Sequence, residues 1–420
     1  MPEPLRTVEW VSTLGGSQPR WITTPSLTAI GQLARRHLDL PAHDPCQVAF
    51  FAEGGFNKLY SIDVPGHACL IRVALPVEPR WKTLSEVATL EFVRRVCTEC
   101  VPKVLAYDDA GDDLGFEWMI MEKLPGRALE ENWENMTWSA KEQLVKTIVG
   151  ILAKLYDHTL SGIGNIYPEP DGSPSSSNTP TVGRIVSMVF FWDKHSDQDV
   201  DPGPFRSSHD WLASRLAFIC NDAAETLRTS DDEDDREEAV ESQALAERLV
   251  RLLPTIFPPQ VDAPERTVIH HDDLSFHNLL VDETGQLTGI VDWECVSALP
   301  LWKACQLPSF LVSPHRAERP RPEAYAADED GRPKELYFEH LREWEKSQLR
   351  AVFFQEMVRV RPEWVHEHHA AKRQIDFDLA VEYCDDELSR KTVERWVDQV
   401  ERMNRGEVSE HMSLRAQLMG

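Results

Sequence analysis

The sequence predicts an α+β protein with two lobes, an antiparallel sheet with one helix and then a larger, mainly helical part. The first observation is a series of short apolar runs bounded by turn residues between residues 46 and 124. The second is the helical periodicity of the segments that follow residue 292. Strands first and helices later are typical of an α+β fold. We therefore expect an N-terminal extension (1–45), an N-terminal lobe (46–124) and a C-terminal lobe with a helical tail (125–420).

The elements of the N-terminal lobe follow from the positions of these runs and turns. One helix is predicted between the third and fourth strands, at residues 83–96, and another at about 27–38 in the otherwise loosely patterned extension. The predicted strands are residues 48–52, 59–64, 68–74, 103–107 and 116–122.

The C-terminal lobe is predicted from helical signals and two breaks. A capping box at Ser139-Ala140-Lys141-Glu142 precedes apolar residues at helical spacing up to Leu155. Further helices are predicted at 335–360, 375–384 and 390–405. The acidic run at residues 231–238 is predicted to be a solvated loop, because blocks of like charge repel one another.

Composition excludes several classes of protein. A formal charge of −26 over 420 residues disfavours nucleic acid and anionic membrane surfaces as partners. It favours a cationic small molecule more than an anionic one. No apolar run approaches the length of a membrane-spanning helix, and the N-terminus has no apolar signal core. Eight cysteines without a scaffold pattern indicate free thiols in a reducing compartment, so we expect a cytoplasmic protein.

The segment from residue 266 to residue 292 carries the chemistry. It contains His271-x-Asp273 and then Asn278, and Asp292 follows fourteen residues after Asn278 at the end of an apolar run. Short strands are predicted at 266–270, 278–282 and 287–292, with a turn at 283–286. This hairpin would place Asp292 beside Asn278, so that two oxygen ligands reach one hard cation such as Mg²⁺.

These motifs resemble the catalytic loop of the aminoglycoside phosphotransferase and choline kinase-like superfamily, and more narrowly a large fungal group of phosphotransferase-family proteins. The resemblance implies a protein kinase-like fold. It also implies that Asp273 is the catalytic base or orients the substrate hydroxyl, and that Asn278 and Asp292 hold Mg²⁺. His271 is expected to be a structural member of the loop, with general base as the alternative role. Asp272 competes with Asp273, but its spacing to Asn278 is one residue too long.

The same resemblance assigns the ATP-binding residues. Gly54, Gly55 and Asn57 lie between the first two strands, where adjacent glycines let backbone N–H groups approach phosphates. Arg72 takes the place of the usual phosphate-binding lysine on the third strand. Its expected partner is Glu86, with Glu91 as a competing choice. The backbone of Glu122 and Leu124 would bind adenine.

Together these features predict an ATP- and Mg²⁺-dependent kinase that acts on a hydroxyl of a small molecule. The charge balance and the resemblance favour a cationic acceptor. Glu294, which follows Asp292-Trp293, either contacts substrate or ties down the loop, and we favour the second role. One alternative is a pseudokinase or nucleotide-binding interaction module, which Arg72 in the lysine position favours. Another is a kinase-fold adenylyl transferase.

Overall fold

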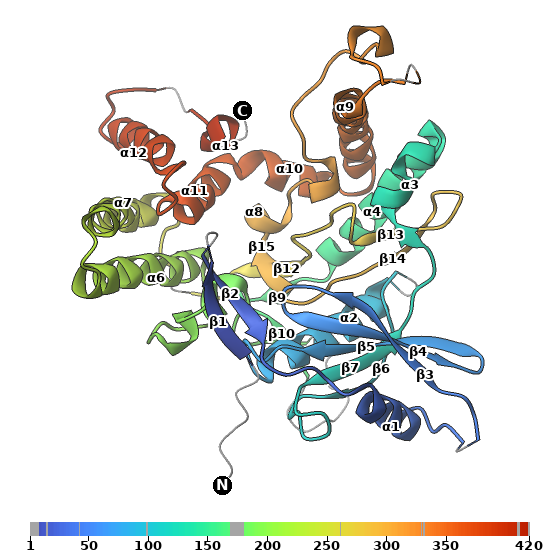
Figure 1. The fold of residues 1–420 in the computed structure, drawn as a ribbon. Helices are drawn as coiled ribbons and strands as arrows, with labels where there is room; N and C mark the ends of the chain where they lie inside the picture. Colours follow the sequence, from blue (N-terminus) through green and yellow to red (C-terminus); the bar gives the residue numbers. More distant parts are fainter. Residues whose placement is uncertain are drawn as a thin grey trace.

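The computed structural model describes residues 8–13, 16–41, 43–97, 100–168, 180–260, 262–328, 330, 332–409 and 412–418. The chain forms an antiparallel sheet with one flanking helix on each face, followed by a larger and mainly helical part (Figure 1). The predicted α+β class is therefore confirmed.

The first part is built on a five-stranded antiparallel sheet with the order β3-β4-β5-β7-β6. Its strands and the helix α2 lie within three residues of the predicted bounds. The elements are β3 (Gln47–Glu53), β4 (Asn57–Val64), β5 (His67–Ala74), α2 (Trp81–Val96), β6 (Val104–Asp108) and β7 (Trp118–Glu122).

The two faces of this sheet differ because strand side chains alternate. Cys69, Ile71 and Val73 of β5 are buried with residues of α1 (Leu27–His37). Arg72 has the opposite parity, so it lies on the face that α2 covers. A charged residue there must find a partner, because an unpaired buried charge is costly.

The N-terminal extension is more structured than the sequence predicted. The helix α1 is confirmed, and Ser26 caps it through a hydrogen bond from the Ala29 N–H. The hairpin of β1 (Val8–Thr13) and β2 (Gly16–Trp21) was not predicted. Its Trp10 lies 5.2 Å from the ring of Trp192. This contact stabilises a hairpin whose own sequence has little alternation.

The second part contains long helices and short strand pairs. The helix α4 begins at Trp138 and is capped by Thr137, so the predicted capping residue Ser139 is wrong, and the cap lies two residues earlier. The short strands are β8 (Arg127–Ala128), β9 (Leu160–Ser161), β10 (Ile166–Tyr167), β11 (Thr181–Val182), β12 (Arg266–His270), β13 (Leu279–Val281), β14 (Leu287–Ile290) and β15 (Ser297–Pro300). The helices are α3 (Leu129–Asn132), α4 (Trp138–Asp157), α5 (Met188–Phe191), α6 (Ser208–Thr229), α7 (Glu233–Ile256), α8 (Leu301–Ala304), α9 (Glu335–Val360), α10 (Pro362–Ala370), α11 (Lys372–Tyr383), α12 (Arg390–Asn404) and α13 (Leu414–Leu418).

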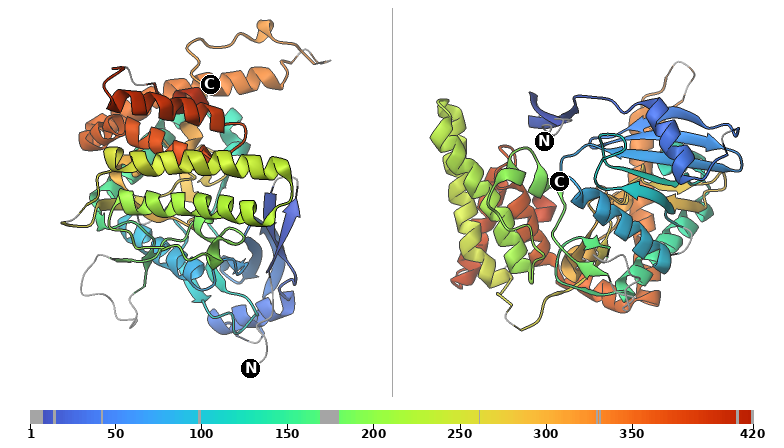
Figure 2. Two further views of the ribbon diagram at one scale, coloured as in Figure 1. Left: turned by 90° about the vertical axis from the view of Figure 1, so that its left-hand side faces the viewer. Right: turned by 90° about the horizontal axis from the view of Figure 1, so that it is seen from below.

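The helices α6 and α7 form an antiparallel pair that no sequence prediction covered (Figure 2). The prediction of a loop at residues 231–238 is wrong, because α7 begins at Glu233. Asp232 caps this helix, and acidic residues fill its first turn. Negative side chains at a helix N-terminus interact favourably with the helix dipole, which offsets part of their mutual repulsion. Among the described residues, no helix is long and apolar enough to cross a membrane.

Gly126 holds the turn that joins the two parts, and we expect Gly126→Ala to destabilise the protein. Its φ is +100°, and an added Cβ would lie 2.7 Å from the carbonyl oxygen of Val281. We expect a loss of about 2–4 kcal/mol in the free energy of unfolding, measured by chemical denaturation. Gly150→Ala in α4 is the control, since its Cβ would have no neighbour within 4 Å. Equal stability of the two variants would contradict the prediction.

Candidate active site

The predicted catalytic loop, residues 271–278 and called the catalytic loop below, lies between β12 and the β13–β14 hairpin. The hairpin pairs Leu279 with Ile290. One residue further out, the Val291 N–H donates to the carbonyl oxygen of Asn278 over 3.0 Å. The predicted hairpin is thus confirmed, and it places Asp292 next to Asn278.

Asp273 and Asn278 contact each other directly across this loop. The Asn278 amide nitrogen donates to the Asp273 carboxylate over 2.7 Å and to the Asp273 carbonyl over 3.0 Å. Asn278 is buried, whereas Asp273 is exposed. Because the amide nitrogen is held by Asp273, the amide oxygen of Asn278 is left for another partner. The carboxylate of Asp273 remains accessible to a substrate.

Asp292 occupies a backbone conformation that is uncommon for a residue with a side chain. Its φ is +65°, in the left-handed region. Such conformations concentrate at functional sites, where the surrounding structure compensates their cost. The side chain is 42% exposed, and one of its oxygens accepts from Arg72 over 2.8 Å.

Arg72 is the centre of a buried ion-pair cluster. Its guanidinium binds Glu86 of α2 and Asp292 of the hairpin, and Glu294 lies 3.7 Å away. Burial opposes the charge of Arg72, but the three carboxylates together raise its pKa. Glu91, the competing choice, is exposed. The structure thus brings Arg72 together with Glu86.

Lys82 is a member of this cluster that the sequence analysis missed. Its ammonium lies 2.6 Å from the Glu294 carboxylate and 2.9 Å from the amide oxygen of Asn57. The Asn57 amide nitrogen also donates to Glu294 over 2.7 Å. Lys82 and Arg72 outweigh the effect of burial and hold the pKa of Glu294 at about 2. Glu294 is therefore tied to the N-terminal sheet and helix, in agreement with the favoured role.

A sequence signal for Lys82 does exist. It lies four residues before Glu86, so both side chains share one face of α2. Thr89, Leu90 and Val93 continue this face and are buried. A lysine on the buried face of a helix predicts a carboxylate partner from another segment.

The two glycines of the proposed phosphate loop lie in the turn between β3 and β4. The Gly54 N–H donates to the Asn57 carbonyl over 2.9 Å, which closes the turn. A Cβ at Gly54 or Gly55 would meet nothing within 4 Å, so space for a ligand is present on this side. The Asn57 side chain points away from this loop, into the cluster with Lys82 and Glu294.

Glu122 and Leu124 lie at the end of β7, where the chain leaves the sheet. The Glu122 N–H donates to the carbonyl of Lys103, as in a regular sheet. No described residue accepts a hydrogen bond from the Leu124 N–H. The Leu124 side chain lies against Gly289 of the hairpin, where an added Cβ would approach it to 2.3 Å. This segment therefore adjoins the hairpin that carries Asp292.

His271 is buried beneath the loop. Its Nε2 lies 3.1 Å from the Val291 carbonyl oxygen, and its ring packs edge-on against Trp293 at 4.8 Å. Burial lowers its pKa, which keeps the ring neutral. These contacts favour the structural role over that of a general base. Asp272 is exposed and makes no hydrogen bond to the described residues.

The donor set around Asp292 fits Mg²⁺ bound together with a nucleotide. The amide oxygen of Asn278 and the second carboxylate oxygen of Asp292 make no hydrogen bond within the part of the chain that the structure describes. Mg²⁺ commonly takes one or two protein oxygens and fills its other positions with phosphate oxygens and water. No cluster of three His, Cys, Asp or Glu ligands occurs among the described residues.

An α+β fold with an Asp–Asn–Asp site between its two parts defines a kinase-type phosphotransferase class. Residues 78–302 match the model of the phosphotransferase enzyme family. This match covers more than half of the chain, which therefore belongs to that family, as the resemblance predicted.

Curated fungal relatives share this region. A subtelomeric hrmA-associated cluster protein of Aspergillus fumigatus is 26% identical over 309 residues, 63% of this chain and 60% of the relative. Clavilactone A biosynthesis cluster protein Y of Ampulloclitocybe clavipes is 25% identical over 59% of each chain. The mitochondrial Altered inheritance of mitochondria protein 9 of Eremothecium gossypii is 24% identical over 60% of this chain and 48% of its own. The match thus spans less than two thirds of each relative.

Solved structures of aminoglycoside phosphotransferase APH(4)-Ia are similar at a lower level. One has a TM-score of 0.43 at 14% identity, covering 91% of this chain and all of its own. Another, a ternary complex with AMP-PNP and hygromycin B, has a TM-score of 0.39 at 16% identity over 66% and 75% of the two chains.

Proposed function

We propose that this protein is an ATP- and Mg²⁺-dependent phosphotransferase that acts on a hydroxyl of a small molecule. The observation that carries the proposal is the convergence of Asp273, Asn278 and Asp292 from one loop and hairpin, with the Arg72–Glu86 pair beside them. Residues 46–124 would form the ATP-binding lobe, and residues 125–420 the catalytic and substrate lobe.

Each residue has a distinct task in this proposal. Asp273 orients the acceptor hydroxyl and takes its proton, because its carboxylate is exposed and fixed by Asn278. Arg72 contacts a nucleotide phosphate, with the Gly54–Gly55 turn beside it and the backbone N–H of Gly55 as a donor, since the Gly54 N–H is held by Asn57. The backbone at Glu122 and Leu124 binds the base. Bound Mg²⁺, held by Asn278 and Asp292, would neutralise charge on the phosphates.

The local charge supports a metal–nucleotide complex as ligand. The cluster contains the carboxylates of Glu86, Asp292 and Glu294 against the cations of Lys82 and Arg72. This balance leaves one negative charge beside the exposed Asp273. A bare polyanion would be repelled there, whereas a nucleotide that brings Mg²⁺ would be accepted.

A calorimetric titration with ATP, with and without Mg²⁺, tests the proposal. We expect binding that requires Mg²⁺ and is lost in Asp292→Ala. Absence of binding by the wild type at millimolar ATP would contradict the proposal.

The pseudokinase alternative is favoured by one contact. The Arg72 guanidinium already occupies one oxygen of Asp292, the carboxylate that a metal would need. In that case ATP binding would not depend on Mg²⁺, and no ADP would form with any acceptor. Release of AMP in place of ADP would instead identify adenylyl transfer.

A further inference from the structure

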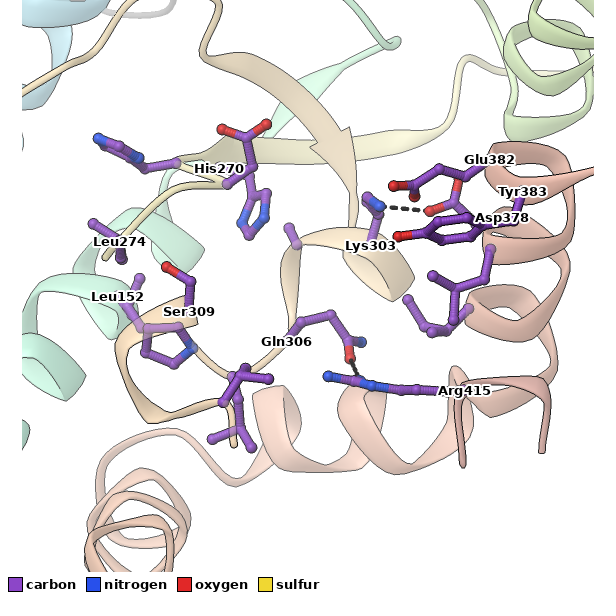
Figure 3. A pocket seen from close by; sticks show the side chains of 18 residues that line it. Leu152, His270, Leu274, Lys303, Gln306, Ser309, Asp378, Glu382, Tyr383 and Arg415 are labelled. Carbon is purple, nitrogen blue, oxygen red and sulfur yellow. Dashed lines mark hydrogen bonds and ion pairs between the residues drawn. The ribbon is translucent and has the colours of Figure 1, made fainter. Parts of the chain in front are cut away.

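A cavity of about 290 Å³ lies beside the catalytic loop, between that loop, α8 and the C-terminal helices α11 and α13 (Figure 3). Leu274 lines it from the loop and Leu152 from α4, and Ile375 and Leu379 line it from α11. These side chains form an apolar wall, which suits the hydrocarbon part of a small molecule.

From the loop, Asp272 lines the cavity directly, and Ser309 connects the cavity to Asp273, which is not itself a lining residue. This serine lines the cavity, and its hydroxyl lies 3.5 Å from an oxygen of Asp273. A hydroxyl group of a ligand in the cavity can therefore approach Asp273 from this side.

The far end of the cavity carries a second cation, the guanidinium of Arg415. The guanidinium of Arg415 lies 3.2 Å from the amide oxygen of Gln306 and points into the cavity (Figure 3). Within the described residues it forms no ion pair. Asp376 accepts from the backbone N–H of Arg415, which fixes the start of α13. Burial lowers the pKa of Arg415, and the nearby carboxylate of Asp376 offsets only part of this effect.

The other cation of the cavity is already neutralised. Lys303 binds the carboxylate of Asp378, which Arg215 also binds from α6. Beside this pair, the ring of His270 points into the cavity (Figure 3). Burial and the nearby Lys303 lower the pKa of His270 to about 3, so the ring is neutral at physiological pH. A neutral imidazole can both donate to and accept from a polar group of a ligand.

We propose that this cavity binds the phosphoryl acceptor and that the acceptor is a hydroxy acid. Its hydroxyl faces Asp273, its apolar chain lies along the wall, and its carboxylate pairs with Arg415. The inference rests on the proposed function for the reaction itself. In that reaction the hydroxyl oxygen bonds to the γ-phosphorus of ATP, and the bond to the β–γ bridging oxygen breaks. ADP leaves with that electron pair, and the hydroxyl proton passes to Asp273 and then to solvent.

An acidic acceptor differs from the cationic acceptor that the net charge favours. Net charge sums the whole surface, including the exposed acidic start of α7, and it does not describe one cavity. The ligand is selected by the groups that line the cavity. The carboxylates Asp272, Asp378 and Glu382 also line the cavity. Asp378 binds Lys303, Glu382 lies beside that pair, and Asp272 lies on the loop, so the charge at the end away from the loop is that of Arg415.

A series of ligands that differ in chain length and in one end group tests this inference on the full chain. The probes are ω-hydroxy acids from hydroxyhexanoate to hydroxydodecanoate, together with the diols and ω-amino alcohols of the same chain lengths. Several chain lengths are needed because the ligand must span the distance from the loop to Arg415. Binding is measured by calorimetry, and turnover by ADP release with Mg²⁺ and ATP. The variant is Arg415→Gln, and Arg373→Gln on the exposed side of α11 is the control with the same change in charge.

We expect one hydroxy acid to bind best, and Arg415→Gln to weaken it about tenfold or more, as for loss of a charge-assisted hydrogen bond. The diol of that length should be unaffected by the variant, and Arg373→Gln should behave as wild type. Stronger binding of the amino alcohol or the diol, or equal binding of the acid by Arg415→Gln, would overturn the inference.

The two proposals fail in distinguishable ways. If the acids bind through Arg415 but no ADP forms, the binding site stands and the phosphotransferase proposal fails. If ADP forms only with amino alcohols or diols, the phosphotransferase stands and the hydroxy acid inference fails. A circular dichroism melt of Arg415→Gln shows whether the variant is folded, and an unfolded variant is replaced by Arg415→Lys, which keeps the charge but cannot bind a carboxylate in bidentate fashion.

Discussion

Asp273→Asn is expected to lower kcat by about 10²- to 10⁴-fold, the usual contribution of a positioned general base. The asparagine keeps the size of the side chain, so the contact with Asn278 and the shape of the loop should persist. It removes the carboxylate that takes the acceptor proton. Affinity for Mg²⁺ and ATP should stay within a few-fold of wild type, because the metal ligands proposed are Asn278 and Asp292. Steady-state kinetics and nucleotide titration measure the two quantities separately.

A variant of the neighbouring Asp272 tests whether Asp273 is correctly assigned as the base. Asp272→Asn is expected to retain most activity, since Asp272 makes no contact with Asn278 in the structure. A large loss in Asp272→Asn with little loss in Asp273→Asn would assign the base to Asp272 instead. Asp262→Asn, at an exposed position ten residues before Asp272, controls for the loss of one negative charge.

Lys82→Met is expected to destabilise the protein by about 3–5 kcal/mol, the usual effect of removing one partner of a buried ion pair. Methionine fills a similar volume, but it leaves the Glu294 carboxylate with Asn57 and a more distant Arg72. The free energy of unfolding from urea denaturation measures the loss. Lys391→Met on the exposed face of α12 is the control.

The cost of Lys82→Met should depend on Glu294 and on pH. In the double variant with Glu294→Gln the buried charge is gone, so a large part of the stability should return. The folded-state pKa of Glu294 is about 2, below the ordinary pKa of a glutamate. Its ion pair therefore stabilises the protein at any pH above that ordinary pKa, and the stabilisation is lost as the pH falls through the folded-state pKa. The difference between wild type and Lys82→Met should therefore be largest near neutral pH and shrink in acid. A difference independent of both Glu294 and pH would contradict this account.

The N-terminal lobe was predictable because its signals are local. The strands β3, β4 and β5 and the helix α2 are each marked by their own apolar pattern and bounded by turns. The pair α6 and α7 was not predicted. The buried stripe of α6 is interrupted by Arg215, whose partner Asp378 lies on α11. The acidic start of α7 resembles a solvated loop until its cap and its packing against α6 are known.

The sequence by itself determined the catalytic loop, because His271, Asp273, Asn278 and Asp292 lie on one loop and one short hairpin whose spacing fixes their separation. The pairing of Arg72 with Glu86 was expected from the family resemblance, and the two side chains form an ion pair in the structure. Only the tertiary structure decided that Lys82, Asn57 and Glu294 meet, and that Arg415 faces the cavity beside the loop. These contacts join segments that are far apart in the chain, so no periodic pattern in the sequence predicts them. The energy of such an ion pair depends on how deeply it is buried, and burial is a property of the folded chain alone.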